Sequence, residues 1–291
     1  MVVVTRRIRN LPWMSLKEFL PAAGWHEHIA AYWVRTTSVG PAGRRVYADG
    51  CADLICNASD STAYFHPMAR QEAVIPLYPG RLYLGGTMTA YGVVRSDAEC
   101  VFTGIRFLPG GFYSVFAQTM EPAVDAVVEF PDRQLCLLMR EPEGLAKRLD
   151  RWFEERAMSG TGKHDFASIR SRIYDSGGQV SVETLASEVH VSNRTLERIF
   201  KENVGIPPKE FLRIVRFQEV LKRLREAGEG SPVGVKVGGP AVLEESLLRI
   251  AFELGYYDHA HLTNEFKKYA GILPSELSHF YKTGIAGGQY F

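Results

Sequence analysis

The chain has 291 residues, about twice the length of a typical domain, so two domains are expected. Hydrophobic residues make up 46% of the chain and charged residues 23%, which excludes a globally disordered protein. The 34 Lys and Arg side chains nearly balance the 33 Asp and Glu side chains, leaving a net charge of +1. No overall charge draws the chain to nucleic acid or to a membrane, so any polyanion site must be local.

The cysteines and the first residues bear on where the protein works. The 4 cysteines have neither Cys-x-x-Cys nor zinc-ligand spacing, and such a small number favours a reducing compartment. Arginines follow the apolar start at Arg6, Arg7 and Arg9, which is the reverse of a signal peptide, and no apolar run approaches a membrane span. The sequence therefore predicts a cytoplasmic protein with no membrane partner.

The first half of the chain has the composition of β-strands. From about residue 31 to residue 106 it is rich in Val, Ile, Tyr, Phe and Thr, and turn signals such as Gly40-Pro41 interrupt it. This pattern predicts several short antiparallel strands in a β-rich domain over residues 1–160. Leu145, Leu149 and Trp152 follow helical spacing, so an amphipathic helix is predicted over 145–156. Residues 161–180 are predicted to be a linker with one short helix.

After residue 180 the pattern becomes helical, and the first two helices predict a helix-turn-helix. Small Ala186 allows the two helices to approach closely, Ser192 is placed to cap the second helix, and Gly205 is placed to stop it. The outer face of this second helix carries side chains able to reach base edges and phosphates in a major groove: Asn193, Arg194, Glu197, Arg198 and Lys201.

A second unit repeats this pattern towards the end of the chain. A long helix is predicted from Pro207-Pro208 to about Arg225, and it leads to the second unit. There Asp258 takes the place of Ser192 and Gly271 takes the place of Gly205, with the same spacing between them. The sequence thus predicts two helix-turn-helix units joined by a long helix over residues 181–282, followed by a flexible tail at 283–291.

These residues resemble the DNA-binding domain of the AraC/XylS family of bacterial transcription regulators. The more diagnostic matches lie in the second unit: Ile250-Ala251, Gly255-Tyr256, Asp258, Phe266-Lys267-Lys268, Gly271 and Pro274. The resemblance implies an α+β fold class, with a β-rich, cupin-like domain before an all-α DNA-binding domain. It also implies that two recognition helices enter successive major-groove segments, with duplex DNA and RNA polymerase as partners. Arg194, Glu197 and Arg198 would then read bases.

The second recognition helix departs from the family pattern. Asn264 stands where relatives often carry Arg, and the remaining DNA-contact candidates on this helix are His259, His261, Thr263 and Lys267. We therefore expect weaker base readout by this helix. Basic and acidic side chains are equal in number over residues 181–282, so phosphate attraction rests on local clusters and nonspecific affinity should be modest. Residues 227–244 form a longer link, rich in glycine, than is usual in the family.

The N-terminal half resembles a β-rich sensor domain that precedes this kind of DNA-binding domain. The resemblance rests on residues 49–55 and 104–111, and such domains bind a small effector, form a homodimer, or do both. Asp49, Asp53 and Arg106 are the candidate effector-binding residues. An ion pair between Arg106 and one of the two aspartates inside the domain is the favoured interpretation of the arginine.

Two other functions stay open at this point. One is a metal-dependent cupin-type enzyme that the helical domain regulates, for which His26-Glu27-His28 supplies an H-x-H pair but no second histidine motif follows. The other is an interaction module that has lost DNA binding, which the balanced charge and Asn264 suggest. No nucleotide-binding, hydrolase or metalloprotease motif occurs, so we predict a regulator that is not an enzyme, without catalytic residues, metal or cofactor.

Overall fold

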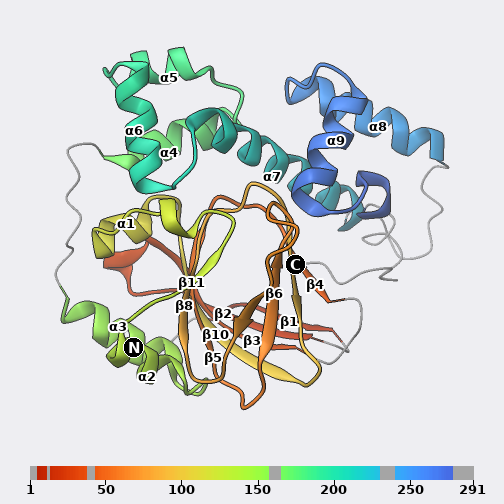
Figure 1. Cartoon of the computed structure of the whole chain (residues 1–291). Coiled ribbons are helices and arrows are strands. Elements are labelled where there is room, and N and C mark those ends of the chain that lie inside the picture. Colours follow the sequence, from red (N-terminus) through yellow and green to blue (C-terminus); the bar gives the residue numbers. More distant parts are fainter. Residues whose placement is uncertain (1–4, 12–13, 38–42, 157–164, 230–239, 278–291) are drawn as a thin grey trace.

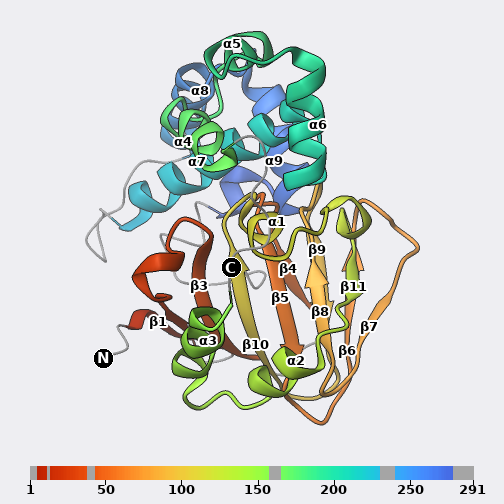
Figure 2. The same cartoon turned by 90° about the vertical axis from the view of Figure 1, so that its left-hand side faces the viewer.

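The computed structural model describes residues 5–11, 14–37, 43–156, 165–229 and 240–277 (Figure 1). A β-rich region comes first, and a helical region lies across one end of it in both views (Figures 1 and 2). This arrangement confirms the predicted α+β fold class. The predicted tail at 283–291 and residues 230–239 of the predicted link lie outside the described residues. No helix in the described ranges combines the length and the apolar character needed to cross a membrane.

The strands of the β-rich region pair antiparallel in two sheets. The larger sheet has the order β1 (Thr5–Leu11), β2 (Met14–Phe19), β3 (Ile29–Thr37), β10 (Cys100–Phe107), β5 (Ala52–Asn57), β8 (Leu82–Gly85), β11 (Val127–Glu129). The smaller sheet has the order β4 (Arg44–Val46), β9 (Gly92–Arg95), β6 (Ala63–Pro67), β7 (Ile75–Leu77). Strands β1, β2 and β11 lie outside the stretch in which composition predicts strands. They are at or near the edges of the larger sheet; β1 and β2 carry charged residues in place of long β-branched runs, and β11 is only 3 residues long.

The larger sheet buries apolar side chains on both of its faces. Tyr32, Leu54 and Ile105 are almost fully buried in one cluster with side chains of three helices, α1 (Gly111–Phe116), α2 (Arg133–Met139) and α3 (Leu145–Glu154). Trp33 and Phe102 belong to another cluster, which continues through the smaller sheet into the helical region. Trp33 lies against Gly104, where a Cβ atom would come within 2.0 Å of the indole ring. Helix α3 confirms the amphipathic helix predicted over 145–156.

The helical region consists of two helix-turn-helix units and the helix that joins them. The first unit is α5 (Val182–Glu188) and α6 (Asn193–Asn203), with α4 (Phe166–Asp175) packed beside it. Helix α7 (Pro208–Glu229) then leads to the second unit, α8 (Pro240–Glu253) and α9 (His259–Ala270). The two units lie on opposite sides of α7 (Figure 1). Residues at both ends of the predicted Gly-rich link, 227–229 and 240–244, are helical.

Candidate nucleic-acid interface

The first helix-turn-helix unit forms through the local signals predicted for it. Ser192 caps α6 by accepting a hydrogen bond from the backbone N–H of Thr195 at 3.1 Å. Ala186 is buried where α5 meets α6, and His190 turns the chain between them with a left-handed φ of 55°. Gly205 follows the end of α6 with a φ of 79°, which glycine adopts without steric cost.

The outer face of α6 presents the polar side chains predicted to contact DNA. Asn193, Arg194, Glu197 and Arg198 are exposed near the start and middle of the helix. Arg198 Nε lies 3.9 Å from Glu202 on the same helix. Lys201 is also exposed, but its Nζ lies 2.8 Å from Oε1 of Glu121, in the short helix η2 (Glu121–Ala123) of the β-rich region. This face can donate hydrogen bonds to base edges through two arginines and to phosphates through a lysine.

The second unit repeats the first in its backbone and its core. Asp258 caps α9 by accepting a hydrogen bond from the backbone N–H of His261 at 2.7 Å. Leu262 and Phe266 are buried on the inner face, in the positions that correspond to Leu196 and Phe200. Gly271 ends the helix with a φ of 72°, as Gly205 does after α6. The internal repeat predicted from the sequence is therefore present in the structure.

The polar face of α9 is less open than that of α6. Asn264 and Lys267 are exposed, whereas His259, His261 and Thr263 are half-buried. The Nε2 atom of His259 and the Oγ1 atom of Thr263 are shielded from solvent and have no hydrogen-bond partner. His261 Nε2 lies 3.5 Å from Oε1 of Glu265. Of the five α9 side chains predicted to contact DNA, two thus face solvent freely, and three are partly turned towards the protein.

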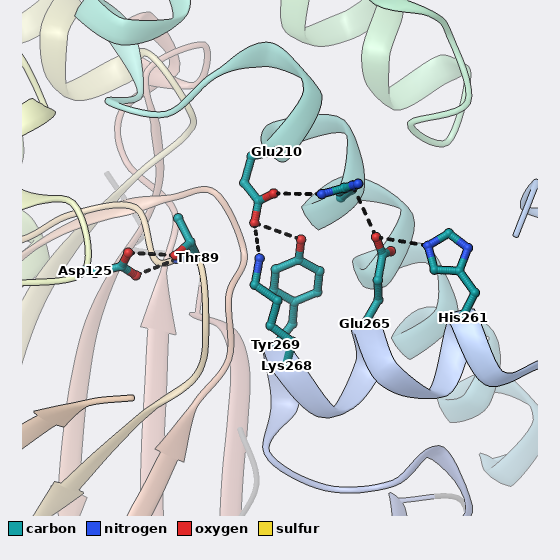
Figure 3. A network of polar contacts seen from close by, with 8 residues as sticks. Thr89, Asp125, Glu210, His261, Glu265, Lys268 and Tyr269 are labelled. Atoms are coloured by element: carbon teal, nitrogen blue, oxygen red, sulfur yellow. Dashed lines mark hydrogen bonds and ion pairs between the residues drawn. The ribbon is translucent and has the colours of Figure 1, made fainter. Parts of the chain in front are cut away.

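A polar network between α7 and α9 is a feature that the sequence reasoning missed (Figure 3). Glu265 is 9% exposed, and its Oε1 atom lies 3.3 Å from Nε of Arg213. The Nη1 atom of Arg213 lies 3.5 Å from Glu210, which also accepts a hydrogen bond from the Tyr269 hydroxyl at 3.0 Å and pairs with Lys268. Burial raises the pKa of Tyr269, and the Glu210 carboxylate raises it further. The three-residue spacing of Glu210 and Arg213 on α7 could have indicated that the two side chains share one helix face and interact.

The three predicted effector residues lie close together in the β-rich region. Arg106 Nη1 lies 3.0 Å from Asp49, and Arg106 Nη2 lies 3.0 Å from Asp53. Asp53 also accepts a hydrogen bond from the indole N–H of Trp33 at 2.9 Å. The favoured internal ion pair of Arg106 is therefore confirmed, with both aspartates rather than one.

Two of these residues line a cavity between the β-rich region and α7. Its volume is about 750 Å³, and Asp49, Cys51 and Arg106 form part of one wall. Gln218, Glu219, Lys222 and Arg225 of α7 form part of the opposite wall. Burial raises the pKa of the Cys51 thiol, and Asp49 raises it further, so the thiol is protonated at neutral pH. Cys51 is thus a poor nucleophile.

The two histidines of the H-x-H pair, His26 and His28, contact different parts of the chain. His26 Nε2 lies 2.9 Å from the carbonyl oxygen of Pro21, and the ring of His28 meets that of Trp25 edge to face. Within the described ranges, no group of three or more His, Cys, Asp or Glu side chains is arranged to hold a metal ion.

Both regions of the chain match known protein families. Residues 17–129 match a family described as a domain of unknown function, DUF6597, and residues 185–234 match a family described as a helix-turn-helix domain. Over 95 residues the chain is 30% identical to an uncharacterized HTH-type transcriptional regulator of Haemophilus influenzae. That alignment covers 33% of this chain and 26% of the relative, so the chain spans about a quarter of the relative's length.

Solved structures also show similarity. ToxT from Vibrio cholerae O395 is 11% identical, with a TM-score of 0.47, over 87% of this chain and 97% of that one. The C-terminal domain of the response regulator yesN from Fusobacterium nucleatum is 21% identical, with a TM-score of 0.27, over 40% of this chain and 94% of that one.

The family match and the coordinates agree on the helical region. The matched residues 185–234 include most of α5, the whole of α6 and the whole of α7, which form the first unit and the connecting helix. The second unit lies beyond the matched residues and repeats the caps and glycine stops of the first. The chain therefore combines a DUF6597 domain in its β-rich region with a helix-turn-helix domain of the kind found in AraC-type transcription regulators.

Proposed function

We propose that this regulator binds specific duplex DNA by laying α6 and α9 into neighbouring segments of the major groove. The observation that carries the proposal is the repeated unit, in which each recognition helix is capped at its start, stopped by a glycine and polar on its outer face. Two such helices read two half-sites about one turn of DNA apart. The proposal assigns the protein to the cytoplasm, where bacterial promoter DNA lies.

The contacts with DNA are divided unequally between the two helices. Arg194, Glu197 and Arg198 of α6 are exposed and have the chemistry to read base edges, and Asn193 has the same exposure. Lys201 and Lys267 contact phosphates, which position the protein without reading sequence. On α9, Asn264 is the exposed reader, and the half-buried His259, His261 and Thr263 contribute less. The α6 half-site is therefore the better defined one.

Removal of Arg198 tests this proposal. Arg198→Ala should weaken binding to the selected duplex by about 1–3 kcal/mol and relax sequence preference in one half-site only. Arg172→Ala is the matched control, because Arg172 is an exposed arginine of α4 that also has a glutamate partner, 3.4 Å away. Footprints and binding curves of the two variants against the wild type give the answer. An unchanged footprint in Arg198→Ala counts against the assignment.

Control of DNA binding comes from the β-rich region in this proposal. A small effector that entered the cavity beside Asp49 and Arg106 would contact both the β-rich region and α7, so its binding energy would bias the position of α7. Asp53 would act through its ion pair with Arg106. A homodimer and contact with RNA polymerase complete the proposed partners. Genomic footprinting with and without cell extract tests whether a small molecule in the extract changes the occupancy of the DNA sites.

A further inference from the structure

Both recognition helices end against the β-rich region, which supplies hydrogen-bond donors to their last carbonyl groups. The backbone N–H of Met120 donates to the carbonyl of Glu202 in α6 at 3.4 Å. The N–H of Tyr91 donates to Lys268, and the N–H of Ala48 donates to Tyr269, each at 3.2 Å. The last carbonyls of a helix have no partner within the helix, so these bonds satisfy groups that would otherwise need water. The β-rich region thus caps α6 and α9.

The glycine stops of the two helices fit closely against the same region. A Cβ atom on Gly205 would lie 2.5 Å from a methyl group of Val124. A Cβ atom on Gly271 would lie 2.5 Å from the ring of Tyr91. These two glycines occupy equivalent positions in the internal repeat, so the two recognition helices dock in the same way at two different places.

The two helix ends meet two loops of the β-rich region. The first docking loop is residues 120–126, which meets the end of α6, and the second docking loop is residues 86–91, which meets the end of α9. Backbone hydrogen bonds join the loops, from Asp125 N–H to Thr87 O at 3.0 Å and from Gly86 N–H to Ala126 O at 3.3 Å. The end of one recognition helix is therefore linked to the end of the other through the β-rich region.

One side chain ties the two docking loops together. The Oδ1 atom of Asp125 accepts a hydrogen bond from the backbone N–H of Thr89 at 2.6 Å, and Oδ2 accepts one from the Thr89 hydroxyl at 2.7 Å (Figure 3). Asp125 is 9% exposed. Its backbone has a φ of 50°, in the left-handed region that is sparsely populated by residues with a Cβ atom, although aspartate and asparagine enter it more readily than most. Such a conformation persists only where the surroundings impose it, and it is common at functional positions.

We propose that Asp125 is a positioning residue for DNA recognition. By fixing the second docking loop against the first, it fixes the separation of α6 and α9 and so sets the spacing of half-sites that the protein accepts. This inference rests on the proposed DNA-binding function. It assigns to the β-rich region a part in operator selection that does not require a bound effector.

The test uses the full-length chain and the duplex that the wild type selects from a randomised library. Derivatives of that duplex have single base pairs inserted or removed between the half-sites, which turns one half-site relative to the other. The wild type should bind these derivatives about tenfold more weakly, because the helices are held at one separation. Asp125→Gly removes the tie but is compatible with the backbone conformation, and it should reduce this penalty to about threefold or less.

Asp125→Asn is the matched rescue variant. Asparagine tolerates the left-handed conformation, and its amide can accept from the Thr89 N–H and donate to the Thr89 hydroxyl, so wild-type spacing selectivity should return. Thermal unfolding of each variant monitors the fold. Should Asp125→Gly not fold, Thr89→Val removes one of the two bonds and should reduce the penalty in the same direction.

The outcomes separate the inference from the function on which it rests. If the wild type selects no duplex, DNA binding itself is wrong. If the wild type selects a duplex and Asp125→Gly shows the same penalties, or loses affinity equally at every spacing, Asp125 has only a local structural role and the positioning inference is overturned.

Discussion

Among single residues, Lys201 has a charged partner in the other region of the chain. Its ammonium group is paired with Glu121 at 2.8 Å, and the two side chains are 61% and 56% exposed. On DNA, Lys201 is proposed to contact a phosphate, and Glu121 would then lie near the same negative charge. Under this proposal, Glu121 and DNA would compete for one cation. The backbone hydrogen bonds that dock α6 do not involve either side chain.

We expect Glu121→Gln to raise affinity for the selected duplex about twofold to fivefold, because an exposed ion pair is weak and a repelling charge is removed. Fluorescence anisotropy at several salt concentrations measures the change. Glu129→Gln is the matched control, since Glu129 forms an equally short and exposed pair with Arg81, at 2.8 Å with side chains 51% and 56% exposed. Unchanged or weaker binding by Glu121→Gln would show that Glu121 does not compete with DNA.

Helical spacing alone could predict that Lys201 is exposed, since Leu196 and Phe200 define the inner face of α6. Its partner could not be predicted, because Glu121 lies far earlier in the chain and is brought near only by the docking of two regions. The same limit applies to Arg106. Its charge and neighbours predicted an internal ion pair, but only the pairing of β10 with β5 decides that Asp53 lies opposite it.

Among the helices, the ends of the two recognition helices, α6 and α9, were predicted correctly because local chemistry sets them. Ser192 and Asp258 cap the helices that follow them, and Gly205 and Gly271 follow their ends, because each signal acts within one turn of backbone. Glu265 shows what spacing cannot predict. Its position on α9 is an inward one, and a carboxylate there is stable only because Arg213 of another helix reaches it.

A matched pair of glycines tests the docking of α6. Gly205 and Gly177 both have left-handed backbones, with φ of 79° and 59°, so alanine strains either one by about 1 kcal/mol. An alanine at position 205 would also clash with Val124, whereas a Cβ atom at position 177 would have no other atom within 4 Å. Gly205→Ala should therefore lower the free energy of unfolding by about 1–3 kcal/mol more than Gly177→Ala does.

Urea denaturation of both variants measures this difference. Gly205→Ala should also weaken binding to the selected duplex, because the clash with Val124 pushes α6 away from the first docking loop. Equal losses of stability in the two variants would mean that the loop yields easily and does not hold the helix. Reduced stability with wild-type DNA binding would mean that docking matters to the fold but not to recognition.

At the scale of the whole molecule, the two regions share one apolar core. The cluster that contains Trp33 and Phe65 in the sheets continues without a break to Phe200 and Phe266 in the helices. Helix α4, in the segment predicted as a linker, contacts both sides. Phe166 packs on Phe200, with ring centroids 5.2 Å apart, and a Cβ atom on Gly110 would come within 2.4 Å of Phe166. Composition marks the change in secondary structure but carries no information about such packing.

Arg170 of α4 provides the polar part of this connection. It is 9% exposed, and its guanidinium donates to the carbonyl oxygens of Pro109 at 2.7 Å and Glu27 at 3.0 Å. Arg170→Ala leaves both carbonyls without this donor, which should lower the free energy of unfolding by about 2–4 kcal/mol. Because the regions share a core, we expect that loss to affect the whole chain rather than α4 alone.

The positions of the tryptophans make this expectation measurable. All 4 tryptophans precede α4 in the sequence, and the three at described positions, Trp25, Trp33 and Trp152, are buried in the β-rich region. Intrinsic fluorescence therefore reports unfolding there, while circular dichroism at the helical band mainly reports the helical region. The two denaturation curves should coincide in the wild type and shift together in Arg170→Ala, as one cooperative unit requires. Arg172→Ala, on the exposed side of α4, should leave both curves in place. Separate curves in the wild type would mean that the regions fold independently and that the shared cluster does not couple them.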